Sequence, residues 1–327
     1  MSKINVAVLM GGRSAEREVS LSTGKMILQA LDHTKYSAFA VDAARLGLEE
    51  SAGQDDGMLP LSYIFQPTAS QPKPDVAFIA LHGEFGEDGT IQGLLELLGI
   101  PYVGSGVLAS ALALDKIMTR KVLQYEGIIV PDGIAVHHPV DVEDVAAQVG
   151  RELGYPVVVK PNCQGSTIGL SVAHDTEDLS LALTTAFSYD ENVLIEEFIQ
   201  GVEITVPVLG NHKLEVLPVV EIVPVSGFYD YHSKYTPGAT DEIVPARLPE
   251  KVYNQTQEIG LACHKALGCR GMSRTDMMVR GNDVFVLEVN TIPGMTPTSL
   301  LPRAAGAAGI EFPQLLDRLI GYALDGG

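Results

Sequence analysis

Apolar and polar positions in the first hundred residues follow two periods, which indicates strands that alternate with helices. Residues 5–10 and 75–81 are short, continuous apolar runs, as expected for buried strands. Residues 20–31 and 92–98 place apolar side chains three to four positions apart, as on one face of a helix. Residues 100–103 form a third apolar run. This order predicts a parallel sheet whose ligand-binding loops lie at the carboxyl ends of its strands.

A second unit is expected from residue 105. Its elements are a helix at 109–127, a helix at 141–153, and strands at 156–160 and 192–196. From about residue 198 the pattern changes to strands and hairpins. Its elements are strands at 203–209 and 213–223, a polar stretch at 225–241, a helix at 250–267 and a hairpin at 273–290. We therefore predict an α/β protein with three units, 1–104, 105–197 and 198–327.

Composition and charge exclude several classes of partner. The chain has 327 residues, of which 46% are hydrophobic and 19% are charged, an ordinary globular composition. It carries 22 basic and 41 acidic side chains, a net charge of −19. Such a surface repels DNA and anionic lipid, so we expect neither a nucleic acid nor a membrane as partner. A nucleotide is not excluded, because a phosphate site needs only a few local cations or N–H groups.

Cysteine usage and the N-terminal residues predict a reduced, cytoplasmic protein. Cys163, Cys263 and Cys269 form no CxxC pair, which argues against a disulfide framework or a zinc site. The longest apolar run, 107–114, is too short to cross a membrane. The first twelve residues run into a strand without the apolar region and cleavage site of a signal peptide.

The C-terminal hairpin carries a candidate metal site. Glu288 and Asn290 stand two positions apart in an apolar strand, so they share one face. A two-residue turn would place Asp276 opposite Leu287, whereas a three-residue loop would place it opposite Glu288. We predict the three-residue loop, because it completes a cluster of oxygen ligands suited to Mg²⁺. Spacing alone leaves open a hairpin with a solvated carboxylate face.

Two further segments could bind a nucleotide. Lys160 ends a predicted strand and precedes a loop that contains Gly165 and Ser166, whose backbone N–H groups could cradle phosphate. The loop is not a Walker A sequence, and a plain turn is the alternative. Glu196 and Glu197 end another strand at the boundary between two units, where backbone groups could meet adenine. A charged strand end is the alternative there.

Loops at the carboxyl edge of the first sheet could bind a substrate. His82 follows a buried strand in a loop rich in glycine and acids, although a lone histidine is more often structural. Glu16 follows Gly11 and Gly12, and it could bind an ammonium group or simply stabilise the start of a helix. The polar stretch that contains Tyr235 has the length of a lid, or of an exposed loop.

Eight segments in order resemble the D-alanine–D-alanine ligase family, and together they span nearly the whole chain. They are MGGRSAEREVSLSTG, ALHGEFGEDGTIQG, LDKIMTRK, VVKPNCQGSTIG, LIEEFIQGVEITV, FYDYHSKY, SRTDMM and LEVNTIPGMTPTSLLP. The most specific are HGxxGEDGxIQG and the pair RxD and LEVNTxPGMT. Thr275 departs from the family, which usually has an aliphatic residue there, and we expect only a small packing effect. Phe198 stands where relatives often carry a bulkier aromatic side chain.

The resemblance implies an ATP-grasp fold with an N-terminal, Rossmann-like parallel-sheet domain. It implies ATP-dependent ligation of two D-alanines to D-alanyl-D-alanine through a D-alanyl phosphate, as a step of peptidoglycan precursor synthesis. It also implies two Mg²⁺ or Mn²⁺ ions and a homodimer. A D-alanine–D-lactate ligase or another ATP-grasp carboxylate–amine ligase is the alternative. The Lys234–Tyr235 pair is typical of family members that make a peptide.

The family's site residues carry over to positions that match its motifs. ATP would be held by Lys116, Lys160, Gly165, Ser166, Glu196, Glu197, Ile199, Glu203 and Lys234. The metal ligands would be Asp276, Glu288 and Asn290. The amino acid substrates would meet Glu16, His82, Arg274, Gly294, Ser299 and Leu300. In addition, Arg274 and the Gly294 backbone would stabilise oxyanion charge, and Ser166 and Tyr235 would link the lid to Glu16.

Two other classes are less consistent with the sequence. An oxidoreductase with a Rossmann domain would need GxGxxG, which Gly11-Gly12 does not provide, and an acid after the second strand, which is not evident. A catalytically inactive nucleotide-binding module would not need both Lys160 and Arg274 together with the three candidate metal ligands.

Overall fold

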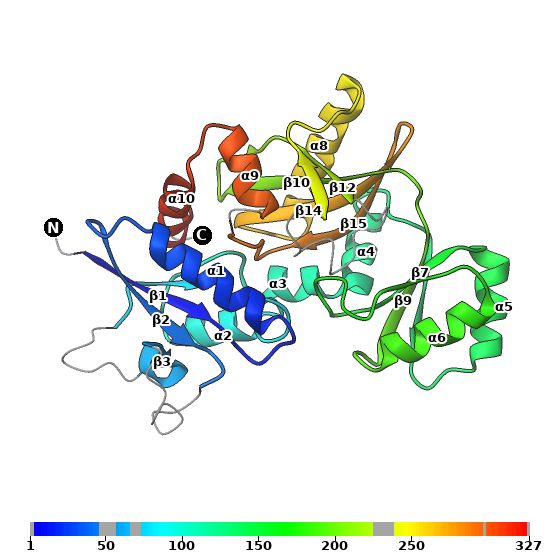
Figure 1. Cartoon of the computed structure of the whole chain (residues 1–327), viewed down its shortest axis with the longest axis horizontal. Helices are drawn as coiled ribbons and strands as arrows, with labels where there is room; N and C mark the ends of the chain where they lie inside the picture. The colour runs from blue at the N-terminus through cyan, green and yellow to red at the C-terminus, as the bar shows by residue number, and fades with distance from the viewer. Residues whose placement is uncertain (1–2, 46–56, 66–72, 225–238, 297–298, 326–327) are drawn as a thin grey trace.

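The chain folds around three β-sheets, which follow one another along the sequence (Figure 1). The computed structural model describes residues 3–45, 57–65, 73–224, 239–296 and 299–325. Each sheet falls within one of the three predicted segments, and helices cover the sheet faces. The described parts therefore have the mixed α/β architecture that the sequence predicts.

The N-terminal sheet is parallel throughout, as predicted, and its strand order is β3-β2-β1-β4-β5. Its elements are β1 (Ile4–Met10), α1 (Arg17–Ala30), β2 (Tyr36–Asp42), β3 (Leu59–Pro60), η2 (Leu61–Ile64), β4 (Val76–Ile79), α2 (Thr90–Leu97) and β5 (Tyr102–Val103). The chain leaves β1 and β4 toward opposite edges of the sheet. The loops after these two neighbouring strands consequently form a crevice at the carboxyl edge, where such sheets bind ligands.

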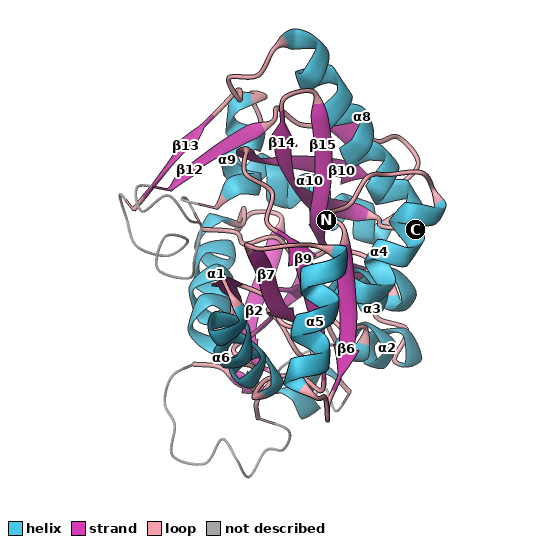
Figure 2. Cartoon of the chain, turned by 90° about the vertical axis from the view of Figure 1, so that its right-hand side faces the viewer, coloured by secondary structure: helices cyan, strands magenta, loops and turns pink. Residues whose placement is uncertain are grey.

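The central sheet is antiparallel and has the order β6-β9-β7-β8. Its elements are β6 (Gly133–His137), α5 (Val142–Glu152), β7 (Val157–Pro161), β8 (Ser171–Ala173), α6 (Thr176–Phe187) and β9 (Asn192–Glu197). The helices α5 and α6 lie over this sheet (Figure 2) and share its apolar core. Lys160 and Glu196 stand on the adjacent strands β7 and β9, which brings their side chains together.

The C-terminal sheet has the order β13-β12-β10-β14-β15, with β11 paired to β10. Its strands are β10 (Val202–Gly210), β11 (Glu215–Val216), β12 (Val220–Pro224), β13 (Thr240–Ile243), β14 (Gly271–Arg280) and β15 (Asp283–Asn290), and α8 (Glu250–Ala266) packs against it. The prediction of one strand at 213–223 was wrong, because the chain makes two strands there. Pro218 lies between them and has no N–H to continue the ladder.

The predicted helix at 109–127 is also two elements, α3 (Val107–Leu114) and α4 (Lys116–Tyr125). Asp115 interrupts it with an extended backbone, and its carboxylate accepts a hydrogen bond from the N–H of Met118 at 2.8 Å. Aspartate is a preferred N-cap because its oxygen satisfies an N–H that has no partner inside the helix. The break places Lys116 in the first turn of a new helix.

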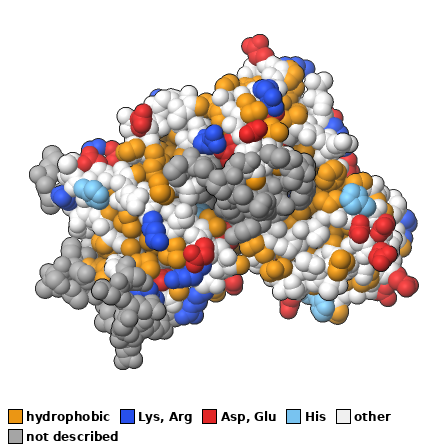
Figure 3. Space-filling model, viewed as in Figure 1, with side chains coloured by type: hydrophobic (Ala, Val, Ile, Leu, Met, Phe, Trp, Pro, Cys, Tyr) orange, Lys and Arg blue, Asp and Glu red, His pale blue; other side chains and the backbone are white. Residues whose placement is uncertain are grey.

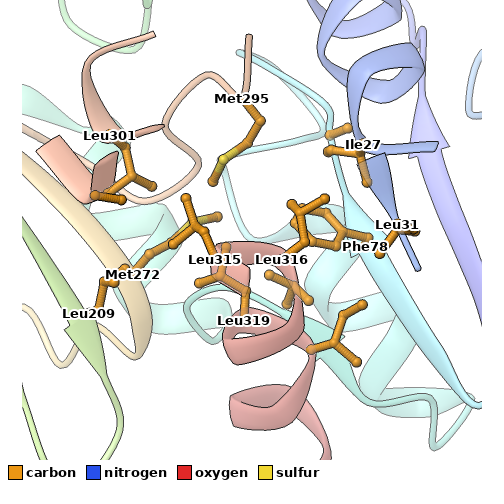
Figure 4. Packing of buried hydrophobic residues seen from close by; sticks show 14 of the residues in the cluster. Ile27, Leu31, Phe78, Leu209, Met272, Met295, Leu301, Leu315, Leu316 and Leu319 are labelled. Carbon is orange, nitrogen blue, oxygen red and sulfur yellow. The ribbon is translucent and has the colours of Figure 1, made fainter. Parts of the chain in front are cut away.

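Two C-terminal helices lie outside the predicted elements, α9 (Leu300–Ala307) and α10 (Phe312–Leu324). Glu311 and Gln314 form a capping box at the start of α10. Figure 4 shows α10 between the N-terminal and the C-terminal sheets, with Leu315, Leu316 and Leu319 facing a shared core that includes Ile27, Phe78, Leu209 and Met272. The first and third sheets are therefore joined by one hydrophobic core.

The hairpin turn differs from the prediction, but Asp276 lies opposite Glu288 as predicted. Arg280 pairs with Asp283, so the turn has two residues and the predicted three-residue loop was wrong. The register then shifts between Asp276 and Met277, and Leu287 is the extra residue of a β-bulge. Beyond the bulge Asp276 lies opposite Glu288, the pairing that the longer loop was expected to give.

Charged side chains of both signs are spread over the face shown in Figure 3, and acidic ones are frequent on the lobe that carries α5 and α6. Within the described ranges, no helix combines the length and the apolar character needed to cross a bilayer.

Candidate active site

Two adjoining clefts contain the described candidate residues. The larger, of about 420 Å³, lies between the central and C-terminal sheets, and its walls include Lys116, Lys160, Glu196, Glu197, Ile199, Glu203, Asp276 and Glu288. The smaller, of about 260 Å³, lies between the first sheet and the C-terminal unit, and its walls include Glu16, His82, Gly165, Ser166, Arg274, Glu288, Asn290, Gly294, Ser299 and Leu300. Glu288 lines both clefts.

The larger cleft holds a buried charge network at one end. Glu196 is almost fully buried and forms an ion pair with Lys160 and another with Arg120, the latter at 2.7 Å. A buried carboxylate is stable only when it is paired in this way. The network leaves Lys160 fixed at the cleft wall, with its ammonium group in a defined place for an anionic ligand.

Lys116 lines the larger cleft close to Glu288, the residue that lines both clefts. Its ammonium group donates to the carbonyl of Gln164 and lies 3.9 Å from the carboxylate of Glu288. Asn162 anchors the start of α4, because its side-chain oxygen accepts from the N–H of Ile117 at 2.8 Å. The loop after Lys160 is therefore bound to α4, and residues of this loop reach into both clefts.

At the hairpin, Asp276 pairs with Glu288, and the side chain of Asn290 lies within hydrogen-bond distance of Asp276. Asp276 accepts from Nε and Nη2 of Arg274 at 2.9 and 2.8 Å, and from Nδ2 of Asn290 at 3.1 Å. In the described part of the chain, no three or more His, Cys, Asp or Glu side chains are placed to hold a metal ion. A cation site here therefore needs the amide oxygen of Asn290 beside two carboxylates, and that set of hard oxygen donors fits Mg²⁺ or Mn²⁺.

The smaller cleft is built around Glu16. Its carboxylate accepts a hydrogen bond from the hydroxyl of Ser166. A Cβ on Gly83 or on Gly165 would come within 2.8 Å of its Oε2 atom, so the carboxylate fits a slot bounded by two glycines. Ser166 and Thr167 have φ values of 50° and 63°, a strained conformation that often marks functional loops. The loop that contains Ser166 therefore contacts the Glu16 carboxylate directly.

Two titratable groups in this cleft have shifted pKa values. Burial, together with the positive charge of Arg274, lowers the pKa of His82 to about 4, so its ring is neutral near pH 7. Its Nε2 atom lies 3.1 Å from the hydroxyl of Thr23. Burial and the neighbouring charge of Glu16 raise the pKa of Glu87 to about 8. Glu87 also accepts a hydrogen bond from the N–H of Gly83 at 2.7 Å.

The far wall of the smaller cleft comes from the start of α9. Ser299 precedes this helix, and its hydroxyl accepts from the N–H of Thr296 at 3.0 Å. A Cβ on Gly294 would lie 2.8 Å from that hydroxyl, so the backbone passes closely there. Leu300 supplies an apolar surface beside them. Lys234 and Tyr235, the predicted lid residues, lie outside the described residues.

Sequence reasoning missed three residues that shape the site. Glu87 stood in the acidic loop after β4, but its proximity to Glu16 depends on two strands that are far apart in sequence. Arg120 lies in the family segment LDKIMTRK, but no role was predicted for it. Asp42 ends β2, a strand that was not predicted, and it accepts two hydrogen bonds from Arg17 at 2.7 and 2.9 Å.

Asp42 also bears on the oxidoreductase alternative. It stands at the end of the second strand, where dinucleotide-binding folds place the acid that binds ribose. Its oxygens are instead used by Arg17, by Arg45 at 3.3 Å and by the N–H groups of Gly12 and Ala44. An acid that is buried and bonded in this way does not face a dinucleotide.

Comparisons with known proteins agree with this geometry. Family models for the N-terminus and the C-terminus of D-ala D-ala ligase match residues 5–105 and 122–321. A D-alanine–D-alanine ligase of Pelotomaculum thermopropionicum is 48% identical, over 98% of this chain and 97% of that protein. The crystal structure of a D-alanine–D-alanine ligase from Bacillus anthracis has a TM-score of 0.80 at 38% identity, over 98% of each chain, and a second structure of it is complexed with ATP. VanG D-Ala:D-Ser ligase from Enterococcus faecalis has a TM-score of 0.81 at 32% identity, over 98% of this chain and all of that one. The chain therefore belongs to the D-alanine–D-alanine ligase family and has its ATP-grasp fold.

Proposed function

We propose that this protein joins two molecules of D-alanine to D-alanyl-D-alanine, with the conversion of ATP to ADP and phosphate, as a step in peptidoglycan precursor synthesis. The observation that carries this proposal is the position of Glu288, whose side chain lines the larger and the smaller cleft at once. A phosphate donor in one cleft and a carboxylate acceptor in the other would meet beside it.

The reaction needs two steps because a carboxylate is a poor electrophile. The carboxylate oxygen of the first D-alanine attacks the terminal phosphorus of ATP, and ADP leaves. The amine of the second D-alanine, as the free base, then attacks the carbonyl carbon of the acyl phosphate and loses a proton. Collapse of the tetrahedral intermediate releases phosphate and leaves the peptide bond. Positioning and neutralisation of charge are the protein's main contributions to such phosphoryl transfer.

The larger cleft would hold ATP. Lys116 and Lys160 would contact its phosphates, and the loop at Gly165 and Ser166 would cover them. The remaining nucleotide contacts would come from Glu196, Glu197, Ile199 and Glu203, with Lys234 from the undescribed segment. Asp276, Glu288 and Asn290 would hold two Mg²⁺ or Mn²⁺ ions, which when bound supply positive charge to the transferring phosphoryl group.

The smaller cleft would hold the amino acids. Glu16 would bind the ammonium group of the first D-alanine, and the neutral ring of His82 would lie beside that substrate. Arg274 and the N–H of Gly294 would stabilise the oxyanion, and such a donor is typically worth about 3 kcal/mol. Ser299 and Leu300 would hold the second D-alanine. Ser166, bonded to Glu16, and Tyr235 would connect closure of the site to the bound substrate.

Two further features belong to this proposal. The three sheets would mark three domains with boundaries near residues 104 and 197, in a cytoplasmic enzyme. Two such chains would form a homodimer. Leu97 of α2 and Leu108 of α3 are 89% and 71% exposed on helices that contact each other, an apolar surface of the kind that a second copy covers.

The deciding experiment measures ADP release with ATP and Mg²⁺, with and without D-alanine, and identifies the product by mass spectrometry. We expect ADP release that depends on D-alanine and a dipeptide as product. Parallel reactions with D-lactate or D-serine as second substrate test the other acceptors, since the VanG relative is a D-Ala:D-Ser ligase. ADP release that D-alanine does not change would overturn the proposal.

A further inference from the structure

The loop that carries Glu16 is held by an ion pair outside both clefts. Residues 11–16 connect β1 to α1, and Gly11 and Gly12 both have positive φ values, 76° and 79°. Such a turn is accessible to glycine but disfavoured for other residues. The conformation of this short connection determines where Glu16, at the start of α1, places its carboxylate.

Asp42 is the anchor of this loop. It is fully buried at the end of β2, and its carboxylate accepts two hydrogen bonds from Arg17, at 2.7 and 2.9 Å. It also accepts from the N–H of Gly12 at 3.4 Å and of Ala44 at 3.0 Å, and Nε of Arg45 lies 3.3 Å away. Burial alone would raise the pKa of Asp42, but the bonds from Arg17 and the backbone outweigh it and keep the pKa below its usual value. The group is therefore a carboxylate throughout the neutral range.

Arg17 also bonds directly to the loop. In addition to its two hydrogen bonds to Asp42, it donates from Nη1 to the carbonyl of Gly12 at 2.9 Å. The pair thus binds both the N–H and the carbonyl of one loop residue. A Cβ on Gly11 would lie 2.5 Å from the Asp42 carboxylate and 2.6 Å from Nη1 of Arg17, so the pair also packs against the turn. Arg17 directly follows Glu16 in the chain.

The Glu16 carboxylate has little room to move. Its carboxylate lies in the slot between Gly83 and Gly165 and accepts from Ser166. A hydrogen bond of 2.7 Å from the Ser14 hydroxyl to the carbonyl of His82 joins the same loop to the loop that follows β4. A small shift of α1 and its preceding loop would move the carboxylate out of this slot.

We infer that Arg17 and Asp42 are positioning residues that preset Glu16 for the ammonium group of the first D-alanine. This inference rests on the proposed function. Neither residue is among the described residues that line the two clefts, so the pair would act through the loop. Loss of the pair should weaken binding of the first amino acid far more than binding of ATP, because the Lys160 network lies in a different unit.

The test follows the first step by adding excess hydroxylamine, which competes with the second D-alanine for the acyl phosphate and traps it as a hydroxamate. The variants are Asp42→Asn, which removes the charge, and Arg17→Lys, which keeps the charge but removes the fork. For Asp42→Asn we expect the KM for D-alanine to rise about tenfold, as a displacement of the binding group by a fraction of an ångström would give, while in both variants the KM for ATP changes less than about twofold. Arg17→Lys should show the smaller effect.

A second readout separates positioning from general loosening. D-lactate has a hydroxyl in place of the ammonium group, so its use as first substrate does not depend on an ion pair with Glu16. The preference for D-alanine over D-lactate, as a ratio of kcat/KM, should fall at least about fivefold in Asp42→Asn. A merely structural defect would lower both values in parallel and leave the ratio unchanged.

The matched control is another forked ion pair, Arg247 and Glu221, joined at 2.6 and 3.0 Å. Arg247→Lys should leave both KM values unchanged. Wild-type protein that forms no hydroxamate from D-alanine would refute the proposed function itself. Active wild type with variants whose KM for D-alanine is unchanged, or whose KM for ATP rises equally, would overturn the positioning role. If Asp42→Asn fails to fold, Arg17→Lys carries the same test.

Discussion

Asp276 of β14 lies opposite Glu288 of β15 because the hairpin contains a bulge at Leu287. The N–H of Val286 beside the bulge donates to the carbonyl of Ile129 at 2.9 Å, outside the hairpin. A regular two-residue hairpin would have put Leu287 opposite Asp276 and carried Glu288 past it. The bulge thus brings two carboxylates to one level of the sheet, at the junction of both clefts.

Glu288→Gln should keep the fold and reduce kcat about 100-fold or more, because the change removes a charge from the place where the phosphoryl group would pass. Assays of ADP release and of thermal unfolding measure the two effects. Asp283→Asn, at the exposed start of the same strand, is the control and should leave both unchanged. Full activity of Glu288→Gln would refute the metal-ligand assignment.

Stability should fall as pH rises from about 5 to 8, because the pKa of Glu87 is raised from 4.5 to about 8 in the folded protein. In that window the folded state holds a proton that the unfolded state has released, so unfolding is favoured by up to about 1.4 kcal/mol per pH unit. Glu87→Gln cannot ionise and should flatten this part of the Tm profile. The exposed neighbour Glu84, changed to Gln, serves as the control, and the same slope in both variants would count against the shifted pKa.

Thr275→Val should stabilise the protein by about 1 kcal/mol, since a buried hydroxyl without a partner costs about that much. Thr275 is fully buried, and its hydroxyl has no hydrogen-bond partner within the described part of the chain. Urea unfolding measures the change. Thr205→Val is the contrasting variant, because the Thr205 hydroxyl donates to Asp276, and its loss should lower both stability and activity. A less stable Thr275→Val protein would show that the hydroxyl has a partner.

Gly165→Ala should lower kcat/KM for D-alanine about tenfold, because the added methyl group would displace the Glu16 carboxylate from its slot. Steady-state kinetics test this, with Tm expected to stay within a few degrees. Gly150→Ala provides the comparison, since it lies in α5 with open space around the added carbon. That change should leave kinetics alone and stabilise the protein by about 0.5–1 kcal/mol. Equal kinetics in both variants would argue against the tight fit at Glu16.

The sequence predicted the parallel N-terminal sheet and the pairing of Asp276 with Glu288 correctly. The sheet follows from the period of apolar residues, and the shared face of Glu288 and Asn290 follows from the alternation of side chains along a strand. The bulge could not be predicted in this way, because these rules assume a regular ladder, whereas Val286 beside the bulge bonds to Ile129, which is far away in sequence. The pairing of Asp276 with Glu288 was therefore predicted correctly, although the three-residue loop on which the prediction depended was wrong.

Residues within one motif could be assigned to the candidate site from the sequence, whereas contacts between separate loops could not. His82 and Glu16 could be placed at one edge of the sheet, but the raised pKa of Glu87 depends on its burial and on the nearby charge of Glu16 in the folded chain. Asp42 was missed together with β2, and its bonds to Arg17, Gly12 and Ala44 join parts of the chain that are separate in sequence. The split at Asp115 was not predicted, because the helical spacing of apolar residues continues on both sides of it.

The core shared by α10 and the first sheet has a consequence for biosynthesis. The smaller cleft takes its walls from Glu16 near one end of the chain and from Leu300 near the other, and α10 fixes these walls relative to each other. A growing chain on the ribosome can form its first sheet early, yet the two walls of the smaller cleft are held together only after α10 has been synthesised.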